Sequence, residues 1–280
     1  MARRPAGLRG FLLALGICCA GLPAEAMAAD PVSLLAATAP VEHDLGDGAR
    51  LLLWRIADRA GAARPLELVV AVLPGGAAHW RVLPVDAAGP RADLLAGLDC
   101  PDGALLTSGG FFVARDEGGF APLGLAVGDG VELSPFAPRR WGGILVRRGP
   151  ASAIVPLAAW QAPDGAGEAL QSSPIVVAEG RNDMLRDDGR LDNRLAVGLD
   201  GRGGMVVVGA FRGGGGAVSL HGLAELILAL EPAAGIAVDG ALALDGGSSA
   251  QILAPGEGLA WGSPLPGYMP NALCFATDGG

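Results

Sequence analysis

Short apolar runs separated by glycine-rich and polar turns recur along the whole chain. Each run ends at turn residues such as Gly, Pro, Asn or Asp, and runs of this length favour strands over helices. The pattern predicts strands at 51–54, 66–73, 79–85, 104–106, 111–113, 123–127, 144–146, 152–155, 174–177, 194–199, 205–208, 241–244 and 251–254.

Two turn sequences predict hairpins. The segment 200–204, Asp-Gly-Arg-Gly-Gly, separates the strands expected at 194–199 and 205–208, and such glycine-rich turns join antiparallel strands. Pro74-Gly75-Gly76 is expected to join 66–73 to 79–85 in the same way.

One segment has the periodicity of a helix. Ser219 is a suitable N-cap, Pro232 is expected to end the helix, and apolar residues recur between them at Leu220, Leu223, Ala224, Ile227 and Leu230. A second, short helix is expected at 91–98. Many strands with few helices predict the α+β class: a single domain with extensive mixed or antiparallel sheet.

The first 28 residues have the pattern of a secretory signal peptide. Three early arginines precede the apolar run 11–22, and Ala26 and Ala28 form a small-residue cleavage site. We therefore expect residues 1–28 to be removed and residues 29–280 to form an exported domain, periplasmic or secreted. A lipoprotein anchor at Cys18 is the alternative.

No apolar run is long enough to predict a membrane span, which needs about 20 residues. The chain carries 20 basic and 29 acidic residues, and its net charge is −9. This acidity argues against non-specific nucleic-acid binding, so no nucleic-acid partner is expected. Any anionic ligand must be held by local hydrogen-bond donors, because the net negative charge of the chain repels it.

Removal of the signal peptide would leave two of the four cysteines, Cys100 and Cys274. In an oxidising compartment they either pair or remain two buried thiols. The three histidines are scattered, and neither CxxC nor HExxH occurs. The sequence therefore predicts no zinc site.

The stretch Ala241 to Ser249 carries the clearest chemical signal. An apolar strand delivers Asp245 into a Gly-Gly-Ser-Ser turn. Glycines let a ligand approach the backbone, and successive exposed amides can bind an anion. The alternative is an ordinary turn in which the aspartate only caps the backbone.

Two other chemistries are weaker at this turn. The segment 246–250 approximates the nucleophile elbow of a serine hydrolase, but a strand is expected after it and no histidine follows His221. Alternatively, Asp245 works with a second carboxylate, and the sequence does not select among Asp192, Asp239 and Asp99.

Five turn segments, taken in order, resemble the phosphodiester glycosidase family. The resemblance spans roughly residues 65 to 275, nearly the whole mature chain. The segments are Ser108-Gly109-Gly110-Phe111-Phe112, Gln171-Ser172-Ser173-Pro174, Arg194-Leu195-Ala196-Val197-Gly198, Leu244 to Ser249 and Pro270-Asn271-Ala272-Leu273. The resemblance implies an α+β fold and a function outside the cytoplasm. It also implies cleavage of the bond between the anomeric carbon of a sugar and a phosphate oxygen. The expected partner is a carbohydrate or sugar-phosphate ligand.

The resemblance also implies roles for residues. Asp245 would be catalytic, as nucleophile, general base or stabiliser of the transition state on the sugar side, or as general acid if it lies next to the phosphate. It would otherwise orient a divalent cation, the one cofactor left open. Arg194 would grip the phosphate. The expected substrate-binding residues are Ser108, Gly109, Gly110, Gln171, Ser172, Gly246, Gly247, Ser248, Ser249 and Asn271.

Two positions depart from the family pattern. Ser108 stands where the family usually has Asn, and Ser173 stands where it tends to have Gly. Two hypotheses follow. The first is an exported glycoside hydrolase acting on a sugar-1-phosphodiester in a glycan or envelope polymer. The second is a non-catalytic envelope module that binds sugar phosphates or exopolysaccharide.

Overall fold

The computed structural model describes residues 30–58, 64–75, 78–85, 88–100, 105–116, 119–161, 167–214, 216–264 and 266–277. The expected signal peptide, with Cys18, lies outside these residues.

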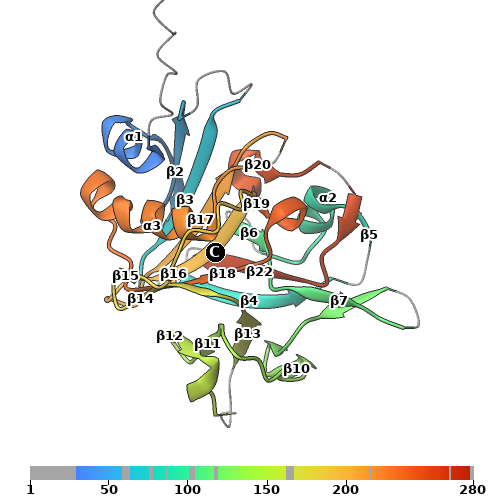
Figure 1. The fold of residues 1–280 in the computed structure, drawn as a ribbon. Coiled ribbons are helices and arrows are strands. Elements are labelled where there is room, and N and C mark those ends of the chain that lie inside the picture. Colours follow the sequence, from blue (N-terminus) through green and yellow to red (C-terminus); the bar gives the residue numbers. More distant parts are fainter. Residues whose placement is uncertain are drawn as a thin grey trace, which may run out of the picture.

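An eight-stranded sheet forms the centre of the fold (Figure 1). Its strands lie in the order β1 (Val41–Gly46), β2 (Ala49–Ile56), β3 (Leu66–Leu73), β17 (Met205–Phe211), β16 (Arg194–Leu199), β18 (Gly240–Ala243), β14 (Ile175–Ala178) and β15 (Arg181–Asn182). The strands that carry the sequence motifs, β16 and β18, are neighbours in it.

Two five-stranded sheets complete the framework. One has the order β20 (Leu259–Gly262), β19 (Gln251–Ala254), β6 (Leu105–Ser108), β22 (Asn271–Thr277) and β4 (Ala78–Pro84). The other has the order β10 (Val131–Ser134), β9 (Ala126–Gly128), β13 (Glu168–Ser172), β11 (Gly143–Arg148) and β12 (Ala151–Pro156).

Smaller elements complete the described fold. Two ribbons pair β5 (Ala88–Pro90) with β21 (Pro266–Tyr268) and β7 (Phe112–Ala114) with β8 (Phe120–Pro122). The α-helices are α1 (Pro31–Ala37), α2 (Arg91–Ala96) and α3 (Leu220–Ala234), and the 3₁₀ turns are η1 (Leu157–Ala159), η2 (Gly247–Ser249) and η3 (Pro255–Glu257).

The core has two layers because alternate residues of a strand point to opposite faces of the sheet. On one face of the large sheet, Leu52 and Val70 pack with α3 residues such as Leu223. On the other face, Leu51 and Val69 belong to a cluster that also contains residues of both five-stranded sheets. Figure 1 shows α1 and α3 side by side on the helical face. The motif-bearing strand ends therefore meet the smaller sheets on the opposite face.

The expected α+β class is confirmed, since antiparallel sheet dominates and helices are few. The hairpin across 200–204 is confirmed as well, by the pairing of β16 with β17. The hairpin expected across Pro74-Gly75-Gly76 is wrong. β3 is already paired on both edges, with β2 and β17, whereas β4 pairs with β22 in another sheet.

The helix begins as expected, because the Ser219 hydroxyl accepts a hydrogen bond from the amide of Gly222. Pro232 does not end it. The proline lies inside the last turn, and the helix ends where Gly235 adopts a left-handed conformation and donates its amide to Glu231. Glycine in a left-handed conformation commonly ends a helix, and the backbone angles of Gly235 show that it does so here.

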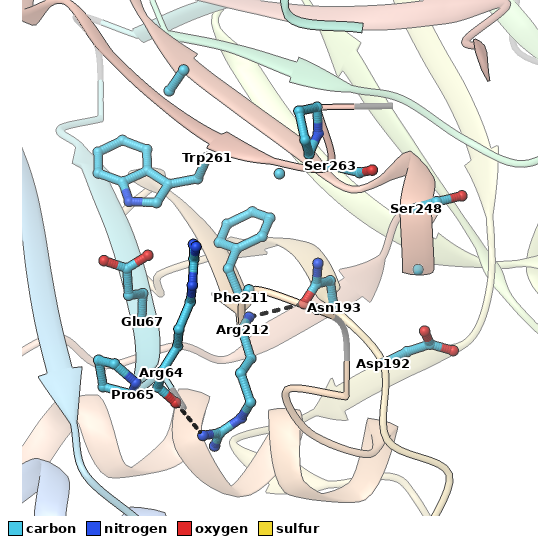
Figure 2. Close-up of a pocket in the computed structure, with 16 residues that line it drawn as sticks. Arg64, Pro65, Glu67, Asp192, Asn193, Phe211, Arg212, Ser248, Trp261 and Ser263 are labelled. Atoms are coloured by element: carbon cyan, nitrogen blue, oxygen red, sulfur yellow. Dashed lines mark hydrogen bonds between the residues drawn. The ribbon is translucent and has the colours of Figure 1, made fainter. Parts of the chain in front are cut away.

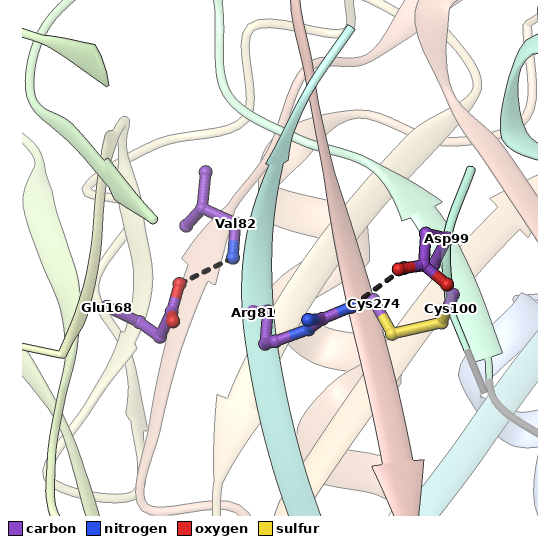
Figure 3. The surroundings of a disulfide bond; sticks show 6 residues. All are labelled: Arg81, Val82, Asp99, Cys100, Glu168 and Cys274. Carbon is purple, nitrogen blue, oxygen red and sulfur yellow. Dashed lines mark hydrogen bonds between the residues drawn. A yellow bond between two sulfur atoms is a disulfide. The ribbon is translucent and has the colours of Figure 1, made fainter. Parts of the chain in front are cut away.

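Cys100 and Cys274 are joined by a disulfide, with their Cα atoms 5.9 Å apart (Figure 3). It fixes the segment after α2 to β22. The Arg81 guanidinium on the neighbouring strand donates to the carbonyl oxygen of Asp99, at 2.7 Å. Within the described part of the chain, none of the helices has the length and apolar character needed to cross a membrane.

Glu168 connects the two smaller sheets. Its buried carboxylate accepts hydrogen bonds from the amide of Val82 on β4, at 2.7 Å, and from the amide of Asp129, at 3.0 Å. Nη2 of Arg147 lies 3.3 Å from Oε1 of Glu168. Burial raises the pKa of this carboxyl, and these partners oppose the rise only in part.

Candidate active site

The Asp245 turn lies at the end of β18, in the middle of the large sheet. The amide of Leu244 still donates to Leu195 on β16, at 2.9 Å, and the chain then leaves the sheet. Asp245 is partly buried. Gly247 has a φ of 61°, a left-handed conformation that suits glycine. A strand, β19, follows the turn, so the helix that a serine-hydrolase elbow requires is not present here.

The turn at 108–110 lies directly against Asp245. The amide of Asp245 donates to the carbonyl oxygen of Gly109, at 3.0 Å. Gly109 in turn donates its amide to the Asn271 carbonyl, at 3.1 Å, and the amide of Gly110 donates to the Asn271 side-chain oxygen, at 2.7 Å. Three of the five motif segments therefore share one set of hydrogen bonds.

Close packing explains why this turn is built from glycines. A Cβ atom on Gly109 would overlap with the side-chain oxygen of Asn271. One on Gly110 would lie 2.9 Å from the carbonyl oxygen of Gln171, too close for real atoms. The two glycines are thus required by the approach of the neighbouring motif segments. Asn271 is buried, and its side-chain NH₂ has no hydrogen-bond partner among the described residues.

The side chain of Ser108 points away from this turn. It is buried, and its hydroxyl accepts a hydrogen bond from the amide of Gln251, at 3.2 Å. Ser249 is also buried, whereas Ser248 is exposed. Among the serines proposed from sequence to bind substrate in these two turns, Ser248 is therefore the one on the surface.

Gln171 and Ser172 join the cluster mainly through structural bonds. The side-chain carbonyl oxygen of Gln171 accepts hydrogen bonds from the backbone amides of Leu125 and Ala137. Its side-chain NH₂ donates to the carbonyl oxygen of Ala137, at 2.6 Å. The Ser172 hydroxyl donates to the carbonyl oxygen of Ala243, two residues before Asp245, at 2.6 Å. The segment 171–173 also lines a cavity of about 230 Å³ with Arg139 and Phe111.

Arg194 lies against the glycine turn, at the first residue of β16. A Cβ atom placed on Gly246 would be 3.6 Å from Nη1 of Arg194. The guanidinium is half-buried: its Nε donates to Val218 and its Nη2 to Arg190, both at backbone carbonyls. Burial lowers the pKa of Arg194, but a guanidinium remains charged in proteins. The N–H groups on Nη1 therefore keep a positive charge beside the turn.

Asp192 is the one of the three candidate partner carboxylates that lies beside the turn. Its Oδ1 would be 3.5 Å from a Cβ atom on Gly247. Asp239 lies at the opposite end of β18 from Asp245, where its amide donates to Leu199, and Asp99 lies next to the disulfide. Among the described residues, no three His, Cys, Asp or Glu side chains are grouped closely enough to hold a metal ion.

A cavity of about 950 Å³ opens beside the turn (Figure 2). Gly247, Ser248 and Asp192 form one part of its lining. Arg64 and Trp261 come from other elements. The motif cluster thus borders on a space large enough for a small-molecule ligand.

Comparison with protein families identifies this arrangement. The model of the phosphodiester glycosidase family matches residues 103–275. This range is more than half of the chain and contains all five motif segments. The chain belongs to the phosphodiester glycosidase family. No curated protein sequence matches the chain at a significant level.

Solved structures share the phosphodiester glycosidase fold of this chain. The catalytic domain of zebrafish N-acetylglucosamine-1-phosphodiester alpha-N-acetylglucosaminidase superposes with a TM-score of 0.61 at 13% identity, over 85% of this chain and 87% of that domain. A hypothetical protein from Synechocystis gives 0.57 at 14%, over 85% of this chain, which spans 64% of that protein. A Burkholderia pseudomallei protein described as exported gives 0.51 at 14%, over 78% and 75%.

The sequence did not indicate the buried ion pair beside this phosphodiester glycosidase site. Nη2 of Arg212 lies 2.6 Å and 2.7 Å from the two carboxylate oxygens of Asp58, 154 residues earlier in the chain. Asn193 lies next to Arg194. Its side-chain oxygen accepts a hydrogen bond from the backbone amide of Arg212, and its backbone carbonyl oxygen accepts one from the amide of Gly247. No local pattern marks such long-range partners.

Proposed function

We propose that this chain is an exported hydrolase that cleaves a sugar-1-phosphodiester, in a glycan or envelope polymer, into a free sugar and a phosphomonoester. The observation that carries the proposal is the convergence of the family's motif segments around Asp245, with Gly109 bonded to its amide and Arg194 on the next strand. A carboxylate and a cation beside one glycine turn suit a substrate that has a sugar on one side and a phosphate on the other.

Asp245 acts on the sugar side in this proposal. As the C1–O bond breaks, the anomeric carbon gains positive charge, and a carboxylate stabilises that charge, attacks the carbon or activates water. The electron pair of the broken bond goes to the phosphate oxygen. Because the leaving group is already acidic, it needs charge stabilisation more than protonation.

The donors for the leaving phosphate come from the turn and from Arg194. The amide of Gly247 donates to Asn193, at 2.8 Å, and the amide of Ser249 donates to Gly246. Within the described residues, the amides of Gly246 and Ser248 are the turn donors without a hydrogen bond to protein. Together with Nη1 of Arg194 they form the proposed anion site.

A turnover assay tests the proposal. Purified protein is expected to release free sugar from the methyl phosphodiester of N-acetylglucosamine 1-phosphate. Asp245→Asn should abolish release and leave the melting temperature nearly unchanged, because asparagine has the same shape as aspartate and keeps the backbone bond to Gly109. Asp239→Asn, the same change at the other end of β18, is the matched control and should be fully active. Turnover by Asp245→Asn at the wild-type rate would remove this residue from the mechanism.

The non-catalytic binding module is a second candidate, and the position of Ser108 favours it. The hydroxyl is turned into the core towards Gln251, where it offers nothing to a ligand, and the family usually has Asn at this place. Binding of sugar phosphates without any product over days would support a binding module. Gain of hydrolysis in Ser108→Asn would show that this position alone had silenced the enzyme.

Export belongs to the same proposal. Cleavage after Ala28 would leave a mature chain that begins near Ala29, by the small-residue rule for signal peptidase. N-terminal sequencing of protein recovered from outside the cytoplasm tests this. A chain that starts at Met1 would contradict export by this route.

A further inference from the structure

The cavity of about 950 Å³ is built from two parts of the chain with different origins. Gly247 and Ser248 come from the family motif, within the matched range 103–275. Arg64 and Glu67 come from the entrance to β3, outside that range. The cavity therefore places side chains from outside the matched range next to the motif turn.

Arg64 is the one charged side chain of this lining that has no ion pair with a described residue. Arg212 is paired with Asp58, and Glu67 lies 3.2 Å from Nε of Arg55. Asp192 lies 4.0 Å from Nε of Arg190. In a chain with a net charge of −9, an exposed arginine that is unpaired among the described residues is a local donor that can hold an anionic ligand.

The surrounding structure holds Arg64 in this position. Nη1 of the buried Arg212 donates to the carbonyl oxygen of Arg64, at 2.8 Å. The Arg64 side chain then crosses Gly213, where a Cβ atom would overlap with its Cδ. Figure 2 shows the side chain extending between Glu67 and Phe211 towards Trp261. A buried ion pair and a glycine thus direct the guanidinium into the cavity.

We propose that this cavity is the aglycone subsite and that Arg64 binds a second phosphate of the substrate, beyond the scissile one. The inference rests on the proposed function. The volume accommodates a ring compound, and Ser248 and Ser263 also line it. A guanidinium fork matches phosphate oxygens in pairs. The preferred substrate class is therefore a sugar joined through a diphosphate to a ring alcohol, either a nucleoside or a second sugar.

Two substrates with the same sugar test the subsite. UDP-N-acetylglucosamine carries the second phosphate, and the methyl phosphodiester of N-acetylglucosamine 1-phosphate does not. Arg64→Gln should lower kcat/KM for the first by about tenfold or more, as expected for loss of a charged hydrogen bond, and leave the second unchanged. A diphosphate-linked disaccharide separates the nucleoside source from the sugar source.

Two further variants sharpen the test. Arg148→Gln removes the same charge from an exposed position on the β11–β12 hairpin and should change neither substrate. Glu67→Gln removes a carboxylate that faces the cavity and should raise kcat/KM for UDP-N-acetylglucosamine, because phosphate is then repelled less. A purely structural Arg64 would not show this substrate dependence.

The outcomes separate the two proposals. If Arg64→Gln affects both substrates equally, or neither, the subsite is wrong although the hydrolase stands. If wild-type protein turns over neither substrate, the hydrolase proposal fails, and calorimetry with UDP and with methyl phosphate decides on the cavity. Weaker UDP binding in Arg64→Gln with unchanged methyl phosphate binding supports the second-phosphate site, and equal UDP binding by both proteins overturns it.

Discussion

The amide nitrogen of Asp245 lies 3.0 Å from the carbonyl oxygen of Gly109, and this hydrogen bond joins two sheets. Asp245 follows β18 of the large sheet, and Gly109 follows β6 of a five-stranded sheet. The main chain that carries the candidate catalytic carboxylate is thus held by backbone from a separate sheet.

Gly109→Ala should disrupt this junction. The added Cβ atom would overlap with the Asn271 side-chain oxygen, and overpacking of this kind costs about 1–3 kcal/mol. We expect a lower free energy of unfolding by urea denaturation, and a loss of turnover larger than the unfolded fraction explains. Gly240→Ala is the control, since a Cβ atom there has its nearest neighbour at 3.9 Å. Equal stability of the two variants would contradict the packing argument.

Substitution of Arg194 should weaken binding of phosphorylated ligands. Arg194→Lys keeps the charge but loses the fork, and Arg194→Ala loses both, so affinity for N-acetylglucosamine 1-phosphate should fall in the order wild type, Lys, Ala. Calorimetry measures it, with Arg202→Lys in the exposed 200–204 turn as the control. Identical affinities in all three proteins would mean that Arg194 does not contact the phosphate.

Reduction of the disulfide should destabilise the fold, although neither cysteine belongs to the five motif segments. Cys100 and Cys274 are separated by 174 residues, and closing so long a loop is worth about 5 kcal/mol in the chain-entropy model. The chain from residue 29 onward, which lacks Cys18 and Cys19, should show no free thiol when it is unfolded without reduction, and reductant should lower its melting temperature. Two titratable thiols before reduction would disprove the bridge.

Glu168 should make stability depend on pH in a defined direction. Burial raises its folded pKa above the ordinary 4.5, so the folded state binds the proton more tightly than the unfolded state. Between 4.5 and the raised value, the free energy of unfolding therefore falls as pH rises. Glu168→Gln does not titrate, so the wild-type stability minus that of the variant should decrease as pH rises above 4.5.

Urea denaturation of both proteins across this range gives the difference directly. Glu132→Gln, on the exposed strand β10, should follow the wild-type curve. A difference that stays flat or increases with pH would show that the hydrogen bonds from Val82 and Asp129 outweigh burial.

The fold class and many strands could be predicted because they depend on local patterns of apolar residues and glycine turns. The β16–β17 hairpin was predictable for the same reason. The partner of β3 was not, because the short loop after it leads into another sheet rather than back along the same one. Local turn chemistry does not reveal which sheet a chain enters next.

The candidate site follows the same division. The motif around Asp245 and the glycines at 109 and 110 are visible in the sequence, but their reason is the approach of Asn271 and Gln171. Arg64 and the Asp58–Arg212 pair have no sequence signal, because their roles arise from contacts across 148 and 154 residues. Such contacts depend on the tertiary arrangement alone.

The bonds at Gly109 also set an order of events during synthesis of the chain. Gly109 accepts from residue 245 and donates to residue 271, so an emerging chain lacks the second of these partners until residue 271 has been made. Contacts this distant form late and slowly. We therefore expect no partially active nascent fragment, and a chain truncated before β22 should be inactive however well its large sheet is formed.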